Sequence, residues 1–419
     1  MPKISVFTPS HQPRWLDQCY ASLKAQTFDD WEWIVLLNDD GEWDPNPDEL
    51  LDDDRVIVDD WDGPRNIGRL KASCVHSSTG DLLVELDHDD ILVPRALEIL
   101  SVAHDTYPEC SMFYSNTMQI NEDGTANLDM FDQRHGWLYH GETVDGVSGI
   151  VTEAMQPTPH NVSNIWYAPN HVRAFPRWAY RQAGGYDPNL EVCDDLDLMC
   201  RLYQVAPFHR IPETLYLQRV HPENTQLHKN ALIQSESLRL YDHYVEPNVL
   251  EWAKRKGLTA LDLGGAHNPR KGYLTVDKHG GDYTGDVFDI LGNMADSSAG
   301  VIRAADFLEH VADKIELMNE IHRVLAPDGM LLSITPSSDG RGAFQDPTHV
   351  SFWNENSFWY YTDQDYAKYV PEITARFQVS RLVTYFPSDW HREHDIPYLC
   401  MNLIALKDGG NRNGGILSW

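Results

Sequence analysis

Short apolar runs alternate with helical stretches along the first part of the chain, and this alternation limits the fold more than any other feature. Apolar runs at residues 4–8, 33–37 and 82–86 are separated by longer segments, one of which, residues 16–25, has the apolar spacing of a helix. Strands that alternate with helices form mostly parallel sheets, because each parallel connection has to cross the sheet. The first part is therefore expected to be a doubly wound α/β domain.

The same alternation of strands, turns and helices resumes after a polar, helical stretch at residues 234–256. Strands are expected at 259–263, 273–276, 301–304 and 330–335, with a helix over 312–325 and a turn at 327–329. This outline is again doubly wound. We expect two α/β domains, residues 1–245 and 258–419, joined by a linker or helix end at 246–257.

The charge balance limits the choice of partners. Among 419 residues there are 33 basic and 64 acidic side chains, which gives a formal net charge of −31. Such a field repels polyanions, so nucleic acid is not the expected partner. The six cysteines form no CxxC pair, so we expect neither a zinc cluster nor a disulfide framework. No signal-peptide pattern opens the chain and no window approaches 18 uncharged apolar residues, which predicts a cytoplasmic protein without a transmembrane segment.

Polar clusters follow the expected strands at the edge of the sheet where α/β proteins bind ligands. They are Thr8-Pro9-Ser10, Asn38-Asp39-Asp40 and Asp87-His88-Asp89-Asp90. In the last cluster, side chains alternate along the strand end, so two carboxylates share one side. Paired carboxylates suit Mg²⁺ or Mn²⁺, which bind oxygen and are often shared with substrate phosphates. In an acidic protein, a solvated turn is the alternative for such a D-x-D sequence.

The run from residue 4 to residue 94 carries three ordered blocks, ISVFTPSH, LDQCYASLKAQTFDDWEWIVLLNDD and NIGRLKASCVHSSTGDLLVELDHDD. In order and spacing they resemble the nucleotide-sugar half of the inverting family 2 glycosyltransferases, which have the GT-A fold. The resemblance implies a nucleoside diphosphate sugar, in the first place a UDP-sugar, as donor. It implies a hydroxyl of a glycan or glycoconjugate as acceptor. A lipid-linked acceptor would place the protein at the periphery of a membrane.

The resemblance also assigns roles to single residues of the donor site. It puts Thr8 and Pro9 beside the nucleotide, Asn38 or Asp39 at the base, Asp87 near the ribose and the metal, and Asp89 on Mn²⁺ or Mg²⁺. In LQRVHPENTQLH, residues 217–228, His221 matches a further metal ligand. Lys71 and Arg219 are expected to meet the phosphate charge.

A further match lies in GGYDPNLEVCDDLDLMCRL, residues 184–202, where the family carries an acidic pair at the start of a helix. The pair here is Asp194-Asp195. By the resemblance, Asp195 is the catalytic base that deprotonates the acceptor hydroxyl, which needs such help because its pKa is high. The alternative is that both acids only cap the helix, where acids are favoured.

The second half opens with TALDLGGAHNPRKGYLTVD, residues 259–277, which combines a strand, a glycine turn and an acid at the end of the next strand. Glycines let the backbone approach a ligand, and the acid can bind ribose hydroxyls. A nicotinamide-dependent oxidoreductase and a methyltransferase both use this arrangement, and a plain tight turn is the third possibility. The later blocks DFLEHV, EIHRVLAPDGMLLSITPS and FQDPTHVSFWNENSF resemble class I S-adenosylmethionine-dependent methyltransferases across residues 258–407.

This second resemblance implies S-adenosylmethionine as a cofactor. It assigns Gly264 and Gly265 to the methionine end, Asp277 to the ribose, Asp286 to the adenine, and Glu309 and His310 to the lining of the site. The customary third glycine of the turn is missing, because residues 264–268 read GGAHN. His349 is a candidate base toward a sugar hydroxyl, or a histidine bonded within its own turn.

Together, these patterns predict a metal-dependent inverting glycosyltransferase with a fused methyltransferase that acts in the same pathway. Fusion keeps an intermediate close, because a tether raises its effective concentration. Two alternatives stay open. The second domain is a degenerate module that only docks or binds, or the glycosyltransferase acts on modified DNA bases, which the charge of −31 disfavours.

Overall fold

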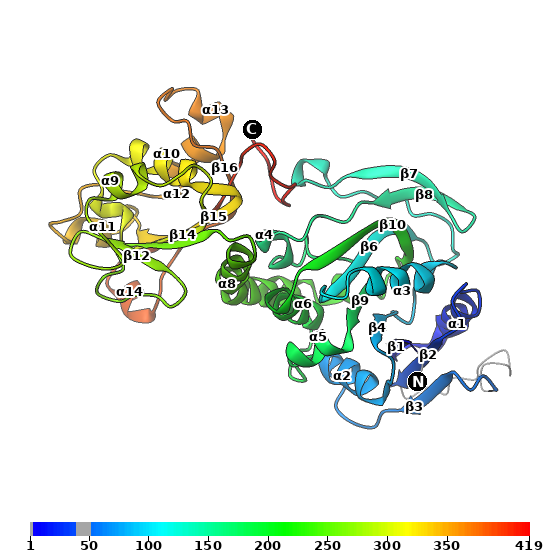
Figure 1. Ribbon diagram of the computed structural model, residues 1–419. Helices are drawn as coiled ribbons and strands as arrows, with labels where there is room; N and C mark the ends of the chain where they lie inside the picture. The colour runs from blue at the N-terminus through cyan, green and yellow to red at the C-terminus, as the bar shows by residue number, and fades with distance from the viewer. Residues whose placement is uncertain (1–2, 39–51) are drawn as a thin grey trace. The chain divides into compact units, whose positions relative to one another are not determined.

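The computed structural model describes residues 3–38 and 52–419, and this part of the chain divides into two compact α/β units (Figure 1). The first consists of Met1–Gln133, Trp137–Pro157 and Asn161–Tyr244; the second consists of Arg134–Gly136, Thr158–His160 and Val245–Trp419. The expected class, two α/β folds each built on its own sheet, is confirmed. The bounds predicted for the two domains stay predictions. Among the described residues, no helix has both the length and the apolar character needed to cross a bilayer.

The sheet of the first unit is parallel at one end and mixed at the other. Its strands in spatial order are β3 (Val56–Asp60), β2 (Trp31–Leu37), β1 (Ile4–Ser10), β4 (Leu82–Glu85), β9 (Arg173–Pro176), β6 (Met112–Ile120), β10 (Phe208–Arg219) and β5 (Ile91–Leu92). Strands β3, β2, β1 and β4 are parallel, whereas β9 runs antiparallel to β4 and β6. The carboxyl ends of β1 and β4 therefore lie side by side.

Apolar sequence and helix spacing explain why the core forms here. Every residue of β1 is buried, as expected for a central parallel strand that is covered on both faces. Helix α1 (Leu16–Lys24) turns Leu16, Cys19, Tyr20 and Leu23 toward the core, at the spacing of one helical face. The other helices before residue 256 are α2 (Ile67–Ser77), α3 (Ala96–Thr106), α4 (Pro159–Val162), α5 (Arg177–Gln182), α6 (Asp194–Val205), α7 (Thr225–His228) and α8 (Asn230–Arg255), with 3-10 turns η1 (Pro13–Trp15) and η3 (Gln133–His135).

A β-hairpin occupies part of the segment 121–170. Strands β7 (Tyr139–Val144) and β8 (Val147–Thr152) pair with each other, and β8 also pairs with β6. The two-residue turn is Asp145-Gly146, and its φ angles of 47° and 81° are those of a tight hairpin turn. An Asp-Gly pair between two strands is the sequence signal of such a hairpin.

The second unit has a sheet whose first five strands are parallel. In residues 245–419, all of which the structure describes, the order is β13 (Tyr283–Thr284), β12 (Leu274–Asp277), β11 (Thr259–Leu263), β14 (Ala299–Ala305), β15 (Leu325–Pro336), β17 (Tyr398–Ala405) and β16 (Phe377–Tyr385). Strand β17 runs antiparallel to both neighbours. The helices are α9 (Val287–Gly292), α10 (Lys314–Val324), α11 (Gly342–Gln345), α12 (Glu355–Thr362), α13 (Gln364–Ala367) and α14 (Asp389–Glu393), with the 3-10 turn η4 (Leu308–His310).

The turn expected at residues 327–329 lies inside β15 as an interruption of its pairing. The partners of β14 jump from Leu325 to Met330, and Asp328 has a φ of 64°. The chain therefore bulges out of the ladder and returns to it. Helix α10 covers this sheet with Leu317, Met318, Ile321 and Val324, all of them buried.

Candidate functional site

A cleft of about 650 Å³ opens at the carboxyl ends of β1 and β4 in the first unit. Most of the residues predicted for the donor and catalytic sites line it, namely Pro9, Asn38, Lys71, Asp87, Asp89, Asp194, Asp195, Arg219 and His221. They come from strand ends, from α2 and from the start of α6. Asp39, the other candidate for the base, lies outside the described residues.

The side chain of Thr8 does not line the cleft, although that of its neighbour Pro9 does, and the place of Thr8 beside the nucleotide stays a prediction. Its side chain is fully buried, and its hydroxyl donates to the Leu86 carbonyl at 2.7 Å and accepts the Trp33 indole N–H at 2.9 Å. Both hydrogen bonds join β1 to its two neighbouring strands. Thr8 is therefore a structural residue under the floor of the site.

The predicted metal ligands are only partly brought together. Asp89 Oδ2 lies 2.8 Å from His221 Nε2, and both residues are buried at the edge of the cleft. His221 Nδ1 accepts the Glu223 backbone N–H at 3.3 Å, which fixes the orientation of the ring. The carboxylate of Asp87 instead lies 3.3 Å from His171 Nε2. Because His221 Nδ1 accepts, its Nε2 carries the proton and donates to Asp89, so His221 offers a lone pair to a cation only if the Glu223 hydrogen bond is given up. Asp89 suits a divalent cation that takes most of its ligands from phosphate and water.

The adjacent acids Asp194 and Asp195 face different partners at the start of α6. Asp194 Oδ2 lies 3.0 Å from Lys71 Nζ, whereas Asp195 Oδ2 lies 2.7 Å from Arg173 Nη1. Asp195 Oδ1 accepts the Leu196 backbone N–H at 2.7 Å. The N-cap of α6 is Cys193, whose side chain makes no capping hydrogen bond, whereas Asp195 accepts an N–H of the first turn. The ion pairs with Lys71 and Arg173 are additional to that bond. Capping alone therefore does not account for the acidic pair.

The two acids also differ in their electrostatic state. Burial, followed by the charges of Asp195 and Glu85, raises the pKa of Asp194 to about 6, although Lys71 acts in the opposite direction. Burial also pushes the pKa of Asp195 upward, but the cations Arg173 and Lys71 outweigh it and leave that pKa lowered. At neutral pH, Asp195 is thus held as a carboxylate at the cleft.

Three buried residues that the sequence analysis missed support this acidic pair. Glu85 forms ion pairs with Lys71 and, at 3.5 Å, with Arg173, and these cations lower its pKa to about 2 against the effect of burial. Arg173 comes from β9, and His171 stacks on Tyr216 with ring centroids 4.8 Å apart. Arg173 and His171 reach the site because β9 inserts between β4 and β6, whereas Glu85 is the last residue of β4 itself. No local motif marks them.

The two cations predicted to meet phosphate are already engaged within the protein. Lys71 forms ion pairs with Glu85 and Asp194, and both acids raise its pKa well above the ordinary value, against the effect of burial. The guanidinium of Arg219 donates to the carbonyl oxygens of Asp89, Asn121 and Glu122 and to Gln18 Oε1. Neither side chain is therefore poised for a diphosphate. Two exposed cations that the sequence analysis missed, Arg65 and Lys229, also line the cleft.

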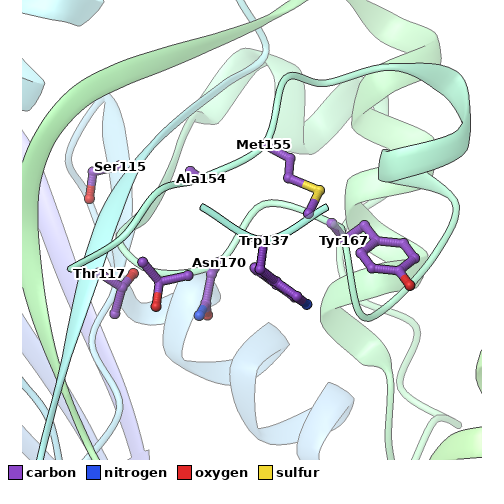
Figure 2. Close-up of a pocket in the computed structure, with 9 residues that line it drawn as sticks. Ser115, Thr117, Trp137, Ala154, Met155, Tyr167 and Asn170 are labelled. Atoms are coloured by element: carbon purple, nitrogen blue, oxygen red, sulfur yellow. The ribbon is translucent and has the colours of Figure 1, made fainter. Parts of the chain in front are cut away.

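A small cavity of about 20 Å³ adjoins the cleft (Figure 2). Trp137, Ala168 and Asn170 line both spaces. The ring of Trp137 lies 6.1 Å from that of Tyr167 and is inclined to it by 48°.

In the second unit the structure brings the glycine turn and the ribose candidate together. Gly264 has a φ of 79°, and a Cβ there would lie 2.7 Å from Phe307 Cδ2. At the end of β12, Asp277 accepts the backbone N–H groups of Ala266 at 3.2 Å and His279 at 2.8 Å. The acid thus orders the loop that follows Gly265. The turn lacks a third glycine, and at Gly264 it is close-packed against Phe307.

The remaining candidates of the second unit fall into two places. Asp286 caps α9 by accepting the Phe288 N–H at 3.0 Å, and it pairs with Lys278 at 3.2 Å. Glu309, His310 and His349 form a separate cluster whose ligand atoms all lie within 4.8 Å of one another. His349 Nδ1 is bonded to the Ala343 carbonyl at 2.9 Å, so this histidine is held by helix α11, which precedes its loop.

Comparison with known proteins matches two family models to these two regions. Residues 5–141 match glycosyl transferase family 2, and residues 259–333 match a methyltransferase domain. The chain carries a family 2 glycosyltransferase domain. The second match adds a methyltransferase domain, so the resemblance to both families is confirmed. The match of the glycosyltransferase domain covers Pro9, Lys71, Asp87 and Asp89, whereas Asp195 and His221 lie beyond residue 141.

The curated relatives of the glycosyltransferase domain are longer proteins. The chain is 24% identical over 249 residues to chondroitin synthase of Escherichia coli, covering 57% of this chain and 32% of that protein. It is 23% identical over 266 residues to hyaluronan synthase of Pasteurella multocida, and this match covers 62% of this chain and 24% of that protein. The chain thus spans a third or less of the length of either relative. Among solved structures, S. aureus TarS 1–349 in complex with UDP-GlcNAc matches 61% of this chain and 72% of that chain, with 12% identity and a TM-score of 0.44.

Proposed function

We propose that the glycosyltransferase domain transfers a sugar, with inversion, from a UDP-sugar to a hydroxyl of a glycan or glycoconjugate. The observation that carries the proposal is the carboxylate of Asp195, which lines the same cleft as the Asp89–His221 pair. A base and a candidate cation site thus share one space large enough for a nucleotide sugar. The names of the two synthases among the relatives support a glycan product.

In this mechanism Asp195 acts on the acceptor. Its carboxylate accepts the proton of the attacking hydroxyl while the new C–O bond forms at the anomeric carbon and the bond to the diphosphate oxygen breaks on the opposite face. Each oxygen of Asp195 already accepts from one partner, Arg173 or the Leu196 N–H, and keeps a second lone pair for the substrate. Arg173 keeps the group ionised and fixes its orientation.

The donor end uses other residues of the cleft. Asp89 and His221 would hold Mn²⁺ or Mg²⁺, which when bound offsets the charge of the diphosphate. Lys229 and Arg65 bring further positive charge from the exposed rim. Asp87 is oriented by His171 toward the ribose side, and Asn38, with Asp39 beside it in the chain, would contact the base.

The test compares Asp195→Asn with Asp187→Asn, an acid in the loop before the same helix that does not line the cleft. The Asp195 variant should lose at least about 100-fold in sugar transfer, because general-base catalysis typically contributes that much. Its calorimetric affinity for UDP with Mn²⁺ should stay within about two-fold of the wild type, because the base does not hold the donor. Asp187→Asn should behave as wild type. Transfer at the normal rate by Asp195→Asn would exclude Asp195 as the base.

For the second unit we propose that S-adenosylmethionine binds at the glycine turn and that its methyl group goes to a hydroxyl of the same glycan pathway. The fit rests on Gly264, where a side chain would collide with Phe307, and on Asp277 at the end of the next strand. When bound, the cofactor supplies an electrophilic methyl group. Asp277 would accept hydrogen bonds from its ribose hydroxyls, with Asp286 near the adenine.

Calorimetric titration with S-adenosylmethionine and S-adenosylhomocysteine tests this second proposal. Asp277→Ala should weaken binding by about 10-fold or more, since both ribose hydrogen bonds are lost. Asp289→Ala, at an acid in the first turn of α9, is the matched control and should bind normally. If the wild-type protein binds neither compound, the methyltransferase proposal is excluded and the unit is a docking module.

A further inference from the structure

Glu309, His310 and His349 meet at the edge of the sheet in the second unit. The first two belong to η4, and His349 lies in the loop that follows α11. Their ligand atoms lie within 4.8 Å of one another, which makes them a group of three that could hold a metal ion. Glu309 and His349 are far apart in the chain.

Glu309 provides the strongest sign of a missing partner. The residue is 2% exposed, and its Oε2 accepts the Thr335 hydroxyl at 2.8 Å. The other oxygen, Oε1, is buried and has no hydrogen-bond partner among the described residues. Buried carboxylate oxygens are rarely left without a partner, because desolvation is then uncompensated. A cation bound beside His310 and His349 would be the missing partner of Glu309 Oε1.

The histidines are oriented as metal ligands are. His349 Nδ1 lies 2.9 Å from the Ala343 carbonyl, and because a carbonyl only accepts, Nδ1 carries the proton and Nε2 the lone pair. His310 Nδ1 lies 3.2 Å from the Thr348 carbonyl, which fixes the same tautomer. A backbone carbonyl on the second ring nitrogen is the usual support of a metal-bound histidine.

The loop that carries His349 is bonded directly to η4. The backbone N–H groups of Val350 and Ser351 donate to the Glu309 carbonyl at 2.9 and 3.0 Å, and the Ser351 hydroxyl donates to the Leu308 carbonyl at 2.9 Å. These bonds hold the three ligands on one rigid framework. Rigid support of this kind is what a metal site requires.

We propose that Glu309, His310 and His349 bind a divalent transition metal ion of the Zn²⁺ type. Two imidazoles and one carboxylate suit Zn²⁺ and its first-row neighbours rather than Mg²⁺, which prefers oxygen. Ligands around tetrahedral Zn²⁺ are about 3.4 Å apart, so the cluster has to close by about 1 Å. His310 is exposed, so its ring can shift toward the other two ligands by lengthening its 3.2 Å hydrogen bond to the Thr348 carbonyl.

Three protein ligands leave a position open for water or for an oxygen of a substrate. Strands β11, β14 and β15 are neighbours, and Phe307, next to η4, packs against Gly264 of the glycine turn. The cluster thus lies in the chain next to the residue that borders the glycine turn, and we infer that a bound metal ion would take a hydroxyl of the methyl acceptor as its further ligand. This last step rests on the proposed methyl transfer, whereas metal binding does not.

The experiment measures Zn²⁺ bound to the full chain by equilibrium dialysis and elemental analysis. It uses a background with Asp89→Asn and His221→Gln, so that the cleft of the first unit does not contribute. We expect one Zn²⁺ per chain, with an affinity at least about 100-fold weaker after Glu309→Gln or His349→Gln. The amide oxygen introduced by Glu309→Gln can still accept the Thr335 hydrogen bond, so this variant should fold. In the same background, Co²⁺ should give visible absorption bands that both substitutions remove.

The matched control is His394→Gln. This histidine also bonds a backbone carbonyl through Nδ1, that of Trp390 at 2.7 Å, but it lies outside the cluster. It should leave Zn²⁺ binding unchanged. Equal Zn²⁺ binding by the background protein and its Glu309→Gln and His349→Gln derivatives would overturn the proposal, as would a stronger response to Mg²⁺ than to Zn²⁺. Titration with S-adenosylmethionine is kept separate, so Zn²⁺ binding without cofactor binding would support the metal site and count only against the methyltransferase.

Discussion

Arg173 Nη1 lies 2.7 Å from Asp195 Oδ2, and the same guanidinium nitrogen lies 3.5 Å from Glu85 Oε2. One buried cation therefore holds two acids, one structural and one at the cleft. Without this cation, the burial of Asp195 would raise its pKa and reduce the ionised fraction.

We expect Arg173→Gln to move the acidic limb of the kcat/KM profile for sugar transfer to higher pH, by about one unit or more. At neutral pH, transfer should fall by at least about 10-fold. Arg173→Lys should restore part of the rate, since the charge returns without the planar fork. The control is Arg210→Gln, at a cation of β10 outside the cleft. A reduced rate with an unshifted pH profile would show that Arg173 does not tune Asp195.

Asp194 should make the stability of the protein depend on pH in a defined direction. Its pKa is raised to about 6, so in the folded state it keeps its proton at pH values where the unfolded chain has lost it. The stabilisation by the protonated acid is present below about pH 4 and is lost as pH rises through about 6. Relative to Asp194→Asn, the wild-type free energy of unfolding should fall by about 3 kcal/mol across this window. Urea unfolding of both proteins at closely spaced pH values measures these free energies. A difference between wild type and Asp194→Asn that stays constant with pH would contradict the prediction.

Variants of Arg219 and Lys229 should have opposite effects, because Arg219 stabilises the fold whereas Lys229 is proposed to bind the ligand. Arg219→Lys removes donors from several buried carbonyls and should lower the free energy of unfolding by about 2 kcal/mol or more. Nucleotide affinity of the folded variant should change little. Lys229→Gln should instead weaken UDP binding by about 3-fold or more without a change in Tm, and Lys229→Arg should retain it. Loss of UDP affinity in Arg219→Lys at unchanged Tm would reverse the two assignments.

The glycine turn of the second unit offers a test with a built-in control. Gly264 and Gly257 have φ angles of 79° and 67°, but a Cβ meets Phe307 only at Gly264, whereas nothing lies within 4 Å at Gly257. Both Ala variants should lose about 1 kcal/mol of stability to the left-handed backbone. Gly264→Ala should lose about 1–3 kcal/mol more through overpacking and should weaken S-adenosylmethionine binding. Thermal unfolding measures the stability of both variants, and calorimetry measures their affinity for S-adenosylmethionine. Equal stability and equal affinity of the two variants would contradict a close-packed cofactor turn.

Several parts of the structure follow from local sequence. The buried runs that form β1, β4 and β11 are continuous in the chain, so their strand character can be predicted without knowledge of their neighbours. The placement of Asp89, Asp195 and Gly264 at strand or helix ends follows in the same way. Parallel strands then bring such ends to one edge of a sheet.

Tertiary structure alone decided which charges remain available and which groups meet. Arg219 and Lys71 look like phosphate ligands in sequence, but buried carbonyls and carboxylates occupy them in the fold. Arg173 reaches Asp195 because β9 inserts between β4 and β6, and His349 reaches Glu309 from a distant loop of the same unit. Sequence encodes the apolar periodicity that builds each element, since that depends on near neighbours. The pairing of buried charges and ligands depends on long-range packing and the desolvation that comes with it, and no local pattern records either.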